Sequence, residues 1–182
     1  IIFCPSALIE EVIQTMNARF NQTKTHPMLH PSIQTRYETR LKEIQSTNTG
    51  KLYVKQDQEF SVTQGFIHVQ NTELNHFETL RQEVFGPFSL VVICNDASEM
   101  KRVAEAMDGQ LTSTLIASAH DITANEDLVD VVTGKCGRII INGVPTGVEV
   151  CLAMQHGGPF PASTDSRFTS VGADAIKRFA RP

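Results

Sequence analysis

The chain has 182 residues, a net charge of -4 and a hydrophobic content of 41%, which suffices for one domain with its own core. Its lysines and arginines are spread along the sequence, which argues against binding to nucleic acid or to an anionic membrane surface. No apolar run approaches the roughly 18 residues of a membrane span. Four cysteines without a CxxC pair indicate reduced thiols in a cytoplasmic protein, and six scattered histidines predict no metal site.

The first part of the chain predicts two amphipathic helices and two short strands. A helix is expected over residues 7–20, with Ser6 as its N-cap and one apolar stripe facing the core. Pro31 opens a second helix. Its apolar side chains recur at helical spacing: Ile33, Tyr37, Leu41 and Ile44. Short extended segments follow at residues 52–55 and 66–69.

From residue 88 onward, buried strands alternate with helices. Strands are expected at 90–94, 111–117 and 138–141, and helices at 98–107 and 125–132. Asp108 and Gly109 are interpreted as the left-handed stop of the first of these helices. Such alternation pairs strands in parallel and places helices on both faces of the sheet. The expected fold class is therefore α/β, a three-layer sandwich with a mostly parallel sheet, and residues 1–182 are expected to form a single domain.

Two sequence motifs point to one enzyme superfamily. Residues 81–87 read R-Q-E-V-F-G-P and resemble the E-[IV]-F-G-P signature of aldehyde dehydrogenases. Residues 137–150, GRIIINGVPTGVEV, and residues 155–163, QHGGPFPAS, resemble the strand and loop of one branch of that superfamily. The branch holds the 2,5-dioxopentanoate (α-ketoglutarate semialdehyde) dehydrogenases and the NADP-dependent fatty aldehyde dehydrogenases. The resemblance implies a catalytic domain of the aldehyde dehydrogenase type, a small aldehyde as substrate, and homo-oligomers.

The resemblance also assigns cofactor-binding roles. Glu83 would bind the nicotinamide ribose hydroxyls of NADP or NAD, and Phe85 would pack beside the nicotinamide. The family's nucleophile sits in a G-Q-x-C turn, whereas Cys4 follows strand-like residues and directly precedes a helix, so Cys4 is expected to be a buried structural thiol. The nucleophile and the cofactor-binding domain are expected upstream of Ile1. No catalytic residue is therefore assigned within the chain, which by itself is expected to be inactive and to bind no cofactor.

Three further residues are candidates for substrate binding. Gly157 matches a glycine pair in the loop that lines the aldehyde tunnel, and His156 stands where the family often has an aromatic residue. A histidine there favours an aldehyde that carries a carboxylate, although a solvent-exposed loop histidine is an equal alternative. Arg167 either binds a substrate carboxylate or pairs with Asp165 inside a polar turn, and Asp165 is expected to be structural.

The leading functional hypothesis is oxidation of a semialdehyde to a carboxylate, with 2,5-dioxopentanoate converted to 2-oxoglutarate as the favoured reaction. A fatty aldehyde dehydrogenase is the first alternative. Acyl-CoA-forming and acyl-phosphate enzymes share the expected fold, but the match over residues 155–163 argues against them. The alternative from another class is a non-catalytic binding or assembly module.

Overall fold

The structure, a computed structural model, describes residues 1–24, 26–56, 62–76, 78–145 and 147–180. The chain divides into two compact units, Ile1–Asp96 and Ala97–Pro182, and each is described by itself. Their parallel strands and helices confirm the predicted α/β class with a mostly parallel sheet. That residues 1–182 form one domain stays a prediction. Thr146 of the loop motif lies outside the described residues. Among those described, no helix is long and apolar enough to cross a membrane.

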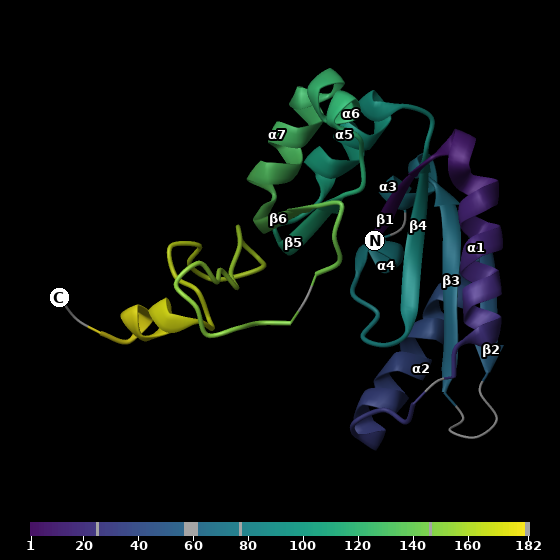
Figure 1. Cartoon of the computed structure of the whole chain (residues 1–182). Helices are drawn as coiled ribbons and strands as arrows, with labels where there is room; N and C mark the ends of the chain where they lie inside the picture. Colours follow the sequence, from purple (N-terminus) through teal and green to yellow (C-terminus); the bar gives the residue numbers. More distant parts are fainter. Residues whose placement is uncertain (25, 57–61, 77, 146, 181–182) are drawn as a thin grey trace. The chain divides into compact units, whose positions relative to one another are not determined.

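The first unit is built on a four-stranded sheet with strand order β1-β4-β3-β2 (Figure 1). The strands are β1 (Ile2–Pro5), β2 (Lys51–Gln56), β3 (Thr63–Gln70) and β4 (Phe88–Cys94). β4 pairs in parallel with both β1 and β3, and β2 runs antiparallel to β3 at one edge. In this register Cys4 lies beside Ile93, and Ile67 lies beside Leu90. The apolar run of β4 is therefore central and is buried on both faces.

Helices cover both faces of this sheet. The long helix α1 (Ile9–Gln22) packs on the face that carries Phe66 and Val91. The helices α2 (Pro31–Ser46), α3 (Asn71–His76) and α4 (Glu78–Arg81) lie on the other side (Figure 1). Strand side chains alternate between faces, so Ile67 and Val92 point toward this second group of helices, and both are buried.

Both long helices form where the sequence predicts them, but α1 begins differently. The second starts at Pro31, and three members of its stripe, Tyr37, Leu41 and Ile44, are buried. The prediction that Ser6 caps α1 is wrong. Ser6 lies inside a short 3₁₀ turn, Ser6–Leu8, that precedes α1, and no side chain caps the turn or the helix. Pro5 occupies the N-cap position of the turn, and its ring offers no hydrogen-bond acceptor.

The second unit contains a parallel pair of strands, β5 (Gln110–Leu115) and β6 (Cys136–Ile141). Three helices, α5 (Ala97–Ala106), α6 (Ala119–Ala124) and α7 (Glu126–Gly134), accompany it, and α7 contacts both α5 and β6. The short α6 was not predicted. It is nucleated by a capping box in which Ser118 and Asp121 each bond to the other's backbone N–H. The remainder is largely irregular and includes a 3₁₀ helix at Ala173–Arg178.

The predicted left-handed stop at Gly109 is also wrong. Among the described glycines, positive φ angles occur at Gly50 and Gly172, and not at Gly109. Gly109 instead makes room for a neighbouring backbone, because a Cβ there would collide with the carbonyl oxygen of Pro159. The glycine is required by close packing rather than by its own conformation.

Candidate functional site

The predicted cofactor-binding residues lie in an irregular loop, residues 82–87, between α4 and β4. Glu83 is exposed, and Phe85 is 65% exposed. Val84, between them, is half-buried. Within the described part of the chain, Glu83 takes part in no ion pair. Both side chains are thus accessible to solvent, and the Glu83 carboxylate has no ion-pair partner among the residues described.

The end of the 82–87 loop that leads into β4 rests on a buried tyrosine of α2. The ring of Tyr37 lies against Gly86 so closely that a Cβ at Gly86 would collide with it. The Tyr37 hydroxyl donates to the carbonyl oxygen of Thr63 at 2.6 Å and lies 3.3 Å from that of Pro87. Burial raises the pKa of Tyr37 well above its ordinary value, so its phenol stays neutral. Tyr37 was predicted only as one member of an apolar stripe.

In the second unit, His156 is fixed by hydrogen bonds to a neighbouring segment. Its backbone N–H donates to Thr169 Oγ1 at 2.9 Å, and its carbonyl oxygen accepts from the Ser170 N–H at 3.0 Å. The imidazole Nδ1 lies 2.8 Å from Ser170 Oγ. The side chain is half-buried. Hydrogen bonds thus fix both the backbone and the ring of His156, and its role in substrate binding stays a prediction.

Gly157 and Gly158, which follow His156, pack directly against the backbone of β5 and β6. A Cβ at Gly137, on β6, would collide with the carbonyl of Gly157, and a Cβ at Gly158 would collide with the carbonyl of Gln110. Both Gly157 and Gly158 are buried. Ser163 closes the turn, because its hydroxyl donates to the Gly158 carbonyl at 2.6 Å. These glycines let the loop lie directly on the ends of β5 and β6.

Arg167 is engaged by the carboxylate of its own turn. Its Nε donates to Asp165 Oδ1 at 3.0 Å and its Nη2 to Oδ2 at 2.6 Å. Hydrogen bonds from the Arg167 side chain lower the pKa of Asp165 to about 2. The pairing expected for a polar turn is thus present, and a substrate carboxylate would have to compete with Asp165 for the guanidinium. Substrate binding by Arg167 stays a prediction.

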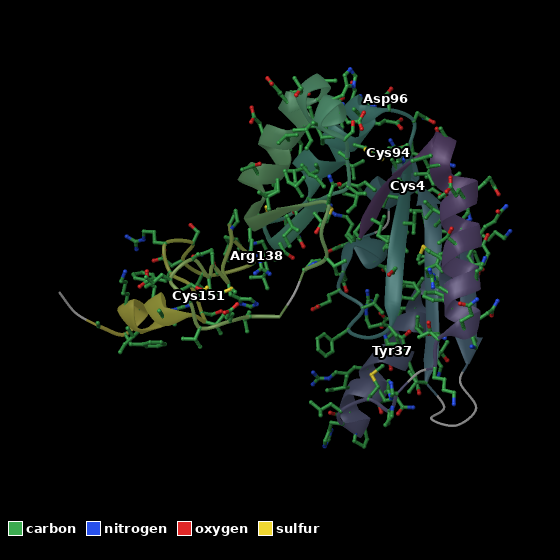
Figure 2. The ribbon with its side chains drawn as sticks, viewed as in Figure 1. Cys4, Tyr37, Cys94, Asp96, Arg138 and Cys151 are labelled. Carbon is green, nitrogen blue, oxygen red and sulfur yellow. The ribbon has the colours of Figure 1, made fainter. Side chains whose placement is uncertain are left out.

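Cys4 is a core residue of the first unit (Figure 2). It is only 3% exposed and packs with Ile13, Phe66 and Val91. Burial raises the pKa of the Cys4 thiol, which disfavours the nucleophilic thiolate. The prediction of a buried structural thiol is confirmed. All four cysteines are free, and no group of three or more His, Cys, Asp or Glu side chains among the described residues could hold a metal ion.

The sequence-predicted residues fall into two groups. Glu83 and Phe85 share one loop of the first unit, whereas His156, Gly157 and Arg167 lie in the second unit, close together in sequence. The sequence did not reveal the residues that contact these candidates and fix their positions, namely Thr169 and Ser170 beside His156 and Tyr37 beside the 82–87 loop. Thr169 and Ser170 gave no signal because isolated hydroxyl residues are common in loops. A tyrosine in an otherwise aliphatic stripe is a weak signal, because a buried phenol needs an acceptor.

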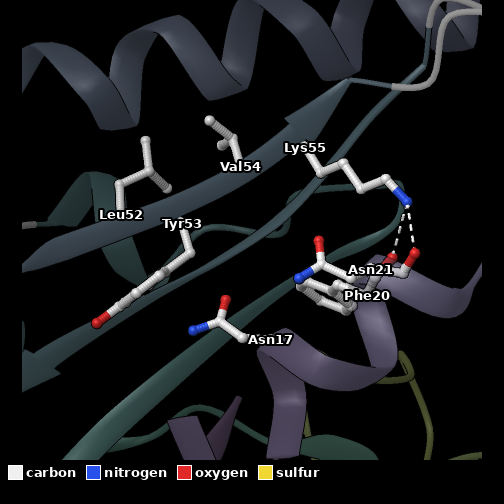
Figure 3. A pocket seen from close by; sticks show the side chains of 7 residues that line it. All are labelled: Asn17, Phe20, Asn21, Leu52, Tyr53, Val54 and Lys55. Atoms are coloured by element: carbon white, nitrogen blue, oxygen red, sulfur yellow. Dashed lines mark hydrogen bonds between the residues drawn. The ribbon is translucent and has the colours of Figure 1, made fainter. Parts of the chain in front are cut away.

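A groove in the first unit is lined by neither Glu83 nor Phe85 (Figure 3). It has a volume of about 310 Å³ and runs between the C-terminal end of α1 and the edge strand β2. Lys55 Nζ donates to the carbonyl oxygens of Phe20 and Asn21, at 3.1 and 3.2 Å. The ammonium group therefore satisfies the last carbonyls of α1, which is a structural role.

Curated proteins match this chain in sequence, among them two dehydrogenases. It is 57% identical over 100 residues to "Alpha-ketoglutaric semialdehyde dehydrogenase 2" of Azospirillum brasilense, which covers 55% of the chain and 19% of that protein. It is 49% identical over 113 residues to the Alpha-ketoglutaric semialdehyde dehydrogenase of Acinetobacter baylyi, covering 62% of the chain and 22% of that protein. The chain thus spans about a fifth of these relatives over the matched region. No protein-family model matches the sequence.

Solved structures give the same fold over nearly the whole chain. The HpcC protein of Thermus thermophilus matches 96% of the chain with a TM-score of 0.72 at 16% identity, over 35% of its own length. An aldehyde dehydrogenase of Bacillus cereus matches 98% with a TM-score of 0.71 at 15% identity, over 36% of its length. A succinic semialdehyde dehydrogenase of Streptococcus pyogenes, solved with NADP+, matches 86% with a TM-score of 0.67 at 13% identity, over 35% of its length. Over the part that it spans, this chain is similar in sequence to the α-ketoglutaric semialdehyde dehydrogenases, and its fold is that of the matched region of aldehyde dehydrogenases.

Proposed function

We propose that the chain is a portion of an NAD(P)-dependent dehydrogenase that oxidises 2,5-dioxopentanoate to 2-oxoglutarate. The observation that carries the proposal is the 57% identity over 100 residues to the Azospirillum brasilense relative, whose name states a semialdehyde of this kind. In the reaction, the aldehyde carbon gives up a hydride to NAD(P)+ and gains an oxygen from water. A fatty aldehyde dehydrogenase and a non-catalytic module are the competing functions.

Glu83 and Phe85 fit the nicotinamide half of the cofactor. Two ribose hydroxyls can donate to one carboxylate, and the Glu83 carboxylate is exposed and has no ion-pair partner among the described residues. The exposed ring of Phe85 offers a flat apolar surface for a nicotinamide ring. When bound, NAD(P)+ supplies the hydride acceptor. The two residues would orient it, and orientation is a large part of the catalysis of such a transfer.

His156 would contribute to recognition of the 2-oxo acid end. Its Nδ1 is occupied by Ser170 Oγ, and no hydrogen bond to Nε2 occurs within the described residues. If the Ser170 hydroxyl donates to Nδ1, the neutral ring carries its proton on Nε2 and can donate to a carboxylate. If that hydroxyl instead donates to the His156 carbonyl, at 2.8 Å, binding of an anion requires the imidazolium. Gly157 would shape the same stretch of the tunnel.

The isolated chain would lack activity because its cysteines do not provide the nucleophile. Cys4 and Cys94 are buried, and neither they nor the half-buried Cys136 and Cys151 stand in the G-Q-x-C turn that carries the family's nucleophile. The nucleophile and most of the cofactor site would come from polypeptide outside these residues. We also expect self-association, because Val144, Val150 and Leu152 of the second unit have side chains that are 81%, 84% and 81% exposed.

The test is production of NAD(P)H by a longer protein that contains this chain, with the 182-residue chain as control. Each is supplied with 2,5-dioxopentanoate, with a long-chain aldehyde or with no aldehyde, and with NAD+ or NADP+. The proposal expects the highest kcat/KM for the longer protein with 2,5-dioxopentanoate. A preference for the long-chain aldehyde would select the fatty aldehyde alternative, and inactivity with every aldehyde would select the binding module.

A further inference from the structure

The helix α2 contacts the chain on both sides of the 82–87 loop. Tyr37 and Arg40 are three positions apart, so they lie on the same face of α2, one turn from each other. Tyr37 contacts the end of the loop that enters β4, and Arg40 contacts α4, from which the loop starts. One rigid element therefore meets both attachment points of the loop that carries Glu83 and Phe85.

The contact at the β4 end is tight and specific. Tyr37 is 1% exposed, its ring lies against Gly86, and its hydroxyl donates to Thr63. The Pro87 carbonyl, 3.3 Å from that hydroxyl, accepts from the Gly65 N–H at 3.0 Å. A phenol has one hydrogen, so the shorter contact to Thr63 is the hydrogen bond, and Pro87 is held beside it. Tyr37 thus joins α2, the start of β3 and the last residues of the loop.

The contact at the α4 end is made by a charged side chain. Arg40 Nη2 donates to the Thr79 carbonyl oxygen at 2.9 Å. An ion pair with Glu43, one turn further along α2, orients the same guanidinium. The side chain of Arg40 is mostly buried, so its contact with Thr79 is shielded from competing water. The short helix α4 is thereby tied to α2 just before the loop begins.

We infer that α2 sets the position of the 82–87 loop, with Tyr37 and Arg40 as its positioning residues. Glu83 and Phe85 are both exposed, so their place in space is determined chiefly by the two ends of the loop. The consequence for catalysis rests on the proposed function, because it requires that these two residues bind the nicotinamide ribose and ring. The positioning of the loop by α2 does not rest on the proposed function. A displacement of the loop by a fraction of an ångström would weaken cofactor binding without altering aldehyde binding.

The first test uses the 182-residue chain and a matched pair of variants. Tyr37→Phe keeps the ring against Gly86 and removes the hydroxyl, and Tyr53→Phe makes the same change on β2, where the ring stacks on Phe66. We expect Tyr37→Phe to accelerate hydrogen exchange of the Gly65 amide about tenfold, as for loss of one buried hydrogen bond. NMR order parameters of the loop amides should fall from about 0.85 toward 0.6. Tyr53→Phe should change neither.

Hydrogen exchange of the Val92 amide, in the centre of β4, distinguishes a change in loop position from a general loss of stability. If Tyr37→Phe accelerates exchange at Val92 as much as at Gly65, the hydroxyl only stabilises the unit, and the inference is overturned. Unchanged exchange and unchanged order parameters would overturn it equally. The variant Arg40→Gln tests the contact at the α4 end, and its readout is the order parameter of the Glu83 amide. Arg36→Gln, at an exposed position of α2, is the matched control.

The second test uses the longer dehydrogenase. Tyr37→Phe should raise KM for NAD(P)+ about three- to tenfold and leave KM for the aldehyde unchanged, whereas Tyr53→Phe should leave both unchanged. Equal changes in the two KM values, or no change, would refute the role in cofactor positioning. A wild-type protein that oxidises no aldehyde would refute the proposed function instead, and the NMR comparison would still decide whether α2 positions the loop.

Discussion

The substitution Gly137→Ala measures how closely the 155–159 segment packs on β6. A Cβ at residue 137 would lie 2.6 Å from the Gly157 carbonyl carbon and 3.1 Å from the Gly158 Cα, whereas ordinary carbon contacts are about 3.5–4.0 Å. The carbonyl oxygen of Gly157 would lie closer still, so the segment must retreat by at least about 1 Å, and such overpacking costs about 1–3 kcal/mol. With an m-value of about 1 kcal/mol/M, the urea midpoint of the second unit falls by about 1–3 M.

A matched control is available in the same unit. A methyl group added at Gly134, the last residue of α7, would meet no atom within 4 Å, so Gly134→Ala should leave stability unchanged or raise it by up to about 1 kcal/mol. Urea unfolding is followed by hydrogen exchange in peptides from β5 and β6. Tyrosine fluorescence reports on the first unit, which contains both tyrosines of the chain. An unchanged midpoint for Gly137→Ala, or equal losses for the two variants, would refute the packing argument.

Three further outcomes are expected. Cys4 should resist alkylation in the folded chain while Cys151 reacts, and mass spectrometry of both sites checks this; rapid alkylation of Cys4 would contradict its burial. Asp165 should titrate near pH 2 by carboxyl NMR, and Arg167→Gln should return it toward 3.8. Because the folded-state pKa is lowered, the pair stabilises the turn above about pH 4, and this contribution disappears as pH falls through 2. Glu83→Gln in the longer dehydrogenase should slow turnover with little change in Tm; normal turnover with a lower Tm would reverse its assignment.

The hydrophobic periodicity of the sequence predicts which helices and strands form better than it predicts where they begin and end. The stripe that includes Tyr37 and Leu41 predicts α2 because a buried helical face needs an apolar residue every three or four positions. The apolar run of β4 is equally clear because this strand is buried on both faces. Short elements depend on a few local hydrogen bonds, such as the two reciprocal bonds between Ser118 and Asp121 that begin α6, and a polar residue in a sequence does not reveal its partner.

In the candidate site, too, a local motif is visible in the sequence, whereas contacts between distant segments are not. Glu83 and Phe85 are candidates because the 81–87 motif resembles the family signature, and their binding of ribose and nicotinamide stays a prediction. What supports them comes from elsewhere in the chain, since Tyr37 precedes the loop by more than 40 residues, and a contact at that separation leaves no local pattern. At Gly109 the sequence instead shows a local pattern that has a different cause in the structure. A glycine after a helix resembles a C-cap, but the backbone it accommodates belongs to Pro159.

The pairing of β1 with β4 has a consequence for synthesis on the ribosome. β1 is synthesised roughly 90 residues before its partner β4, so nascent β1 and α1 have no completed sheet on which to dock. Until β4 arrives, the apolar side chains of α1 and of Phe66 remain open to chaperones. The sheet of the first unit therefore cannot be completed until β4 has left the ribosome, and slow synthesis before this point would prolong the exposure of these side chains.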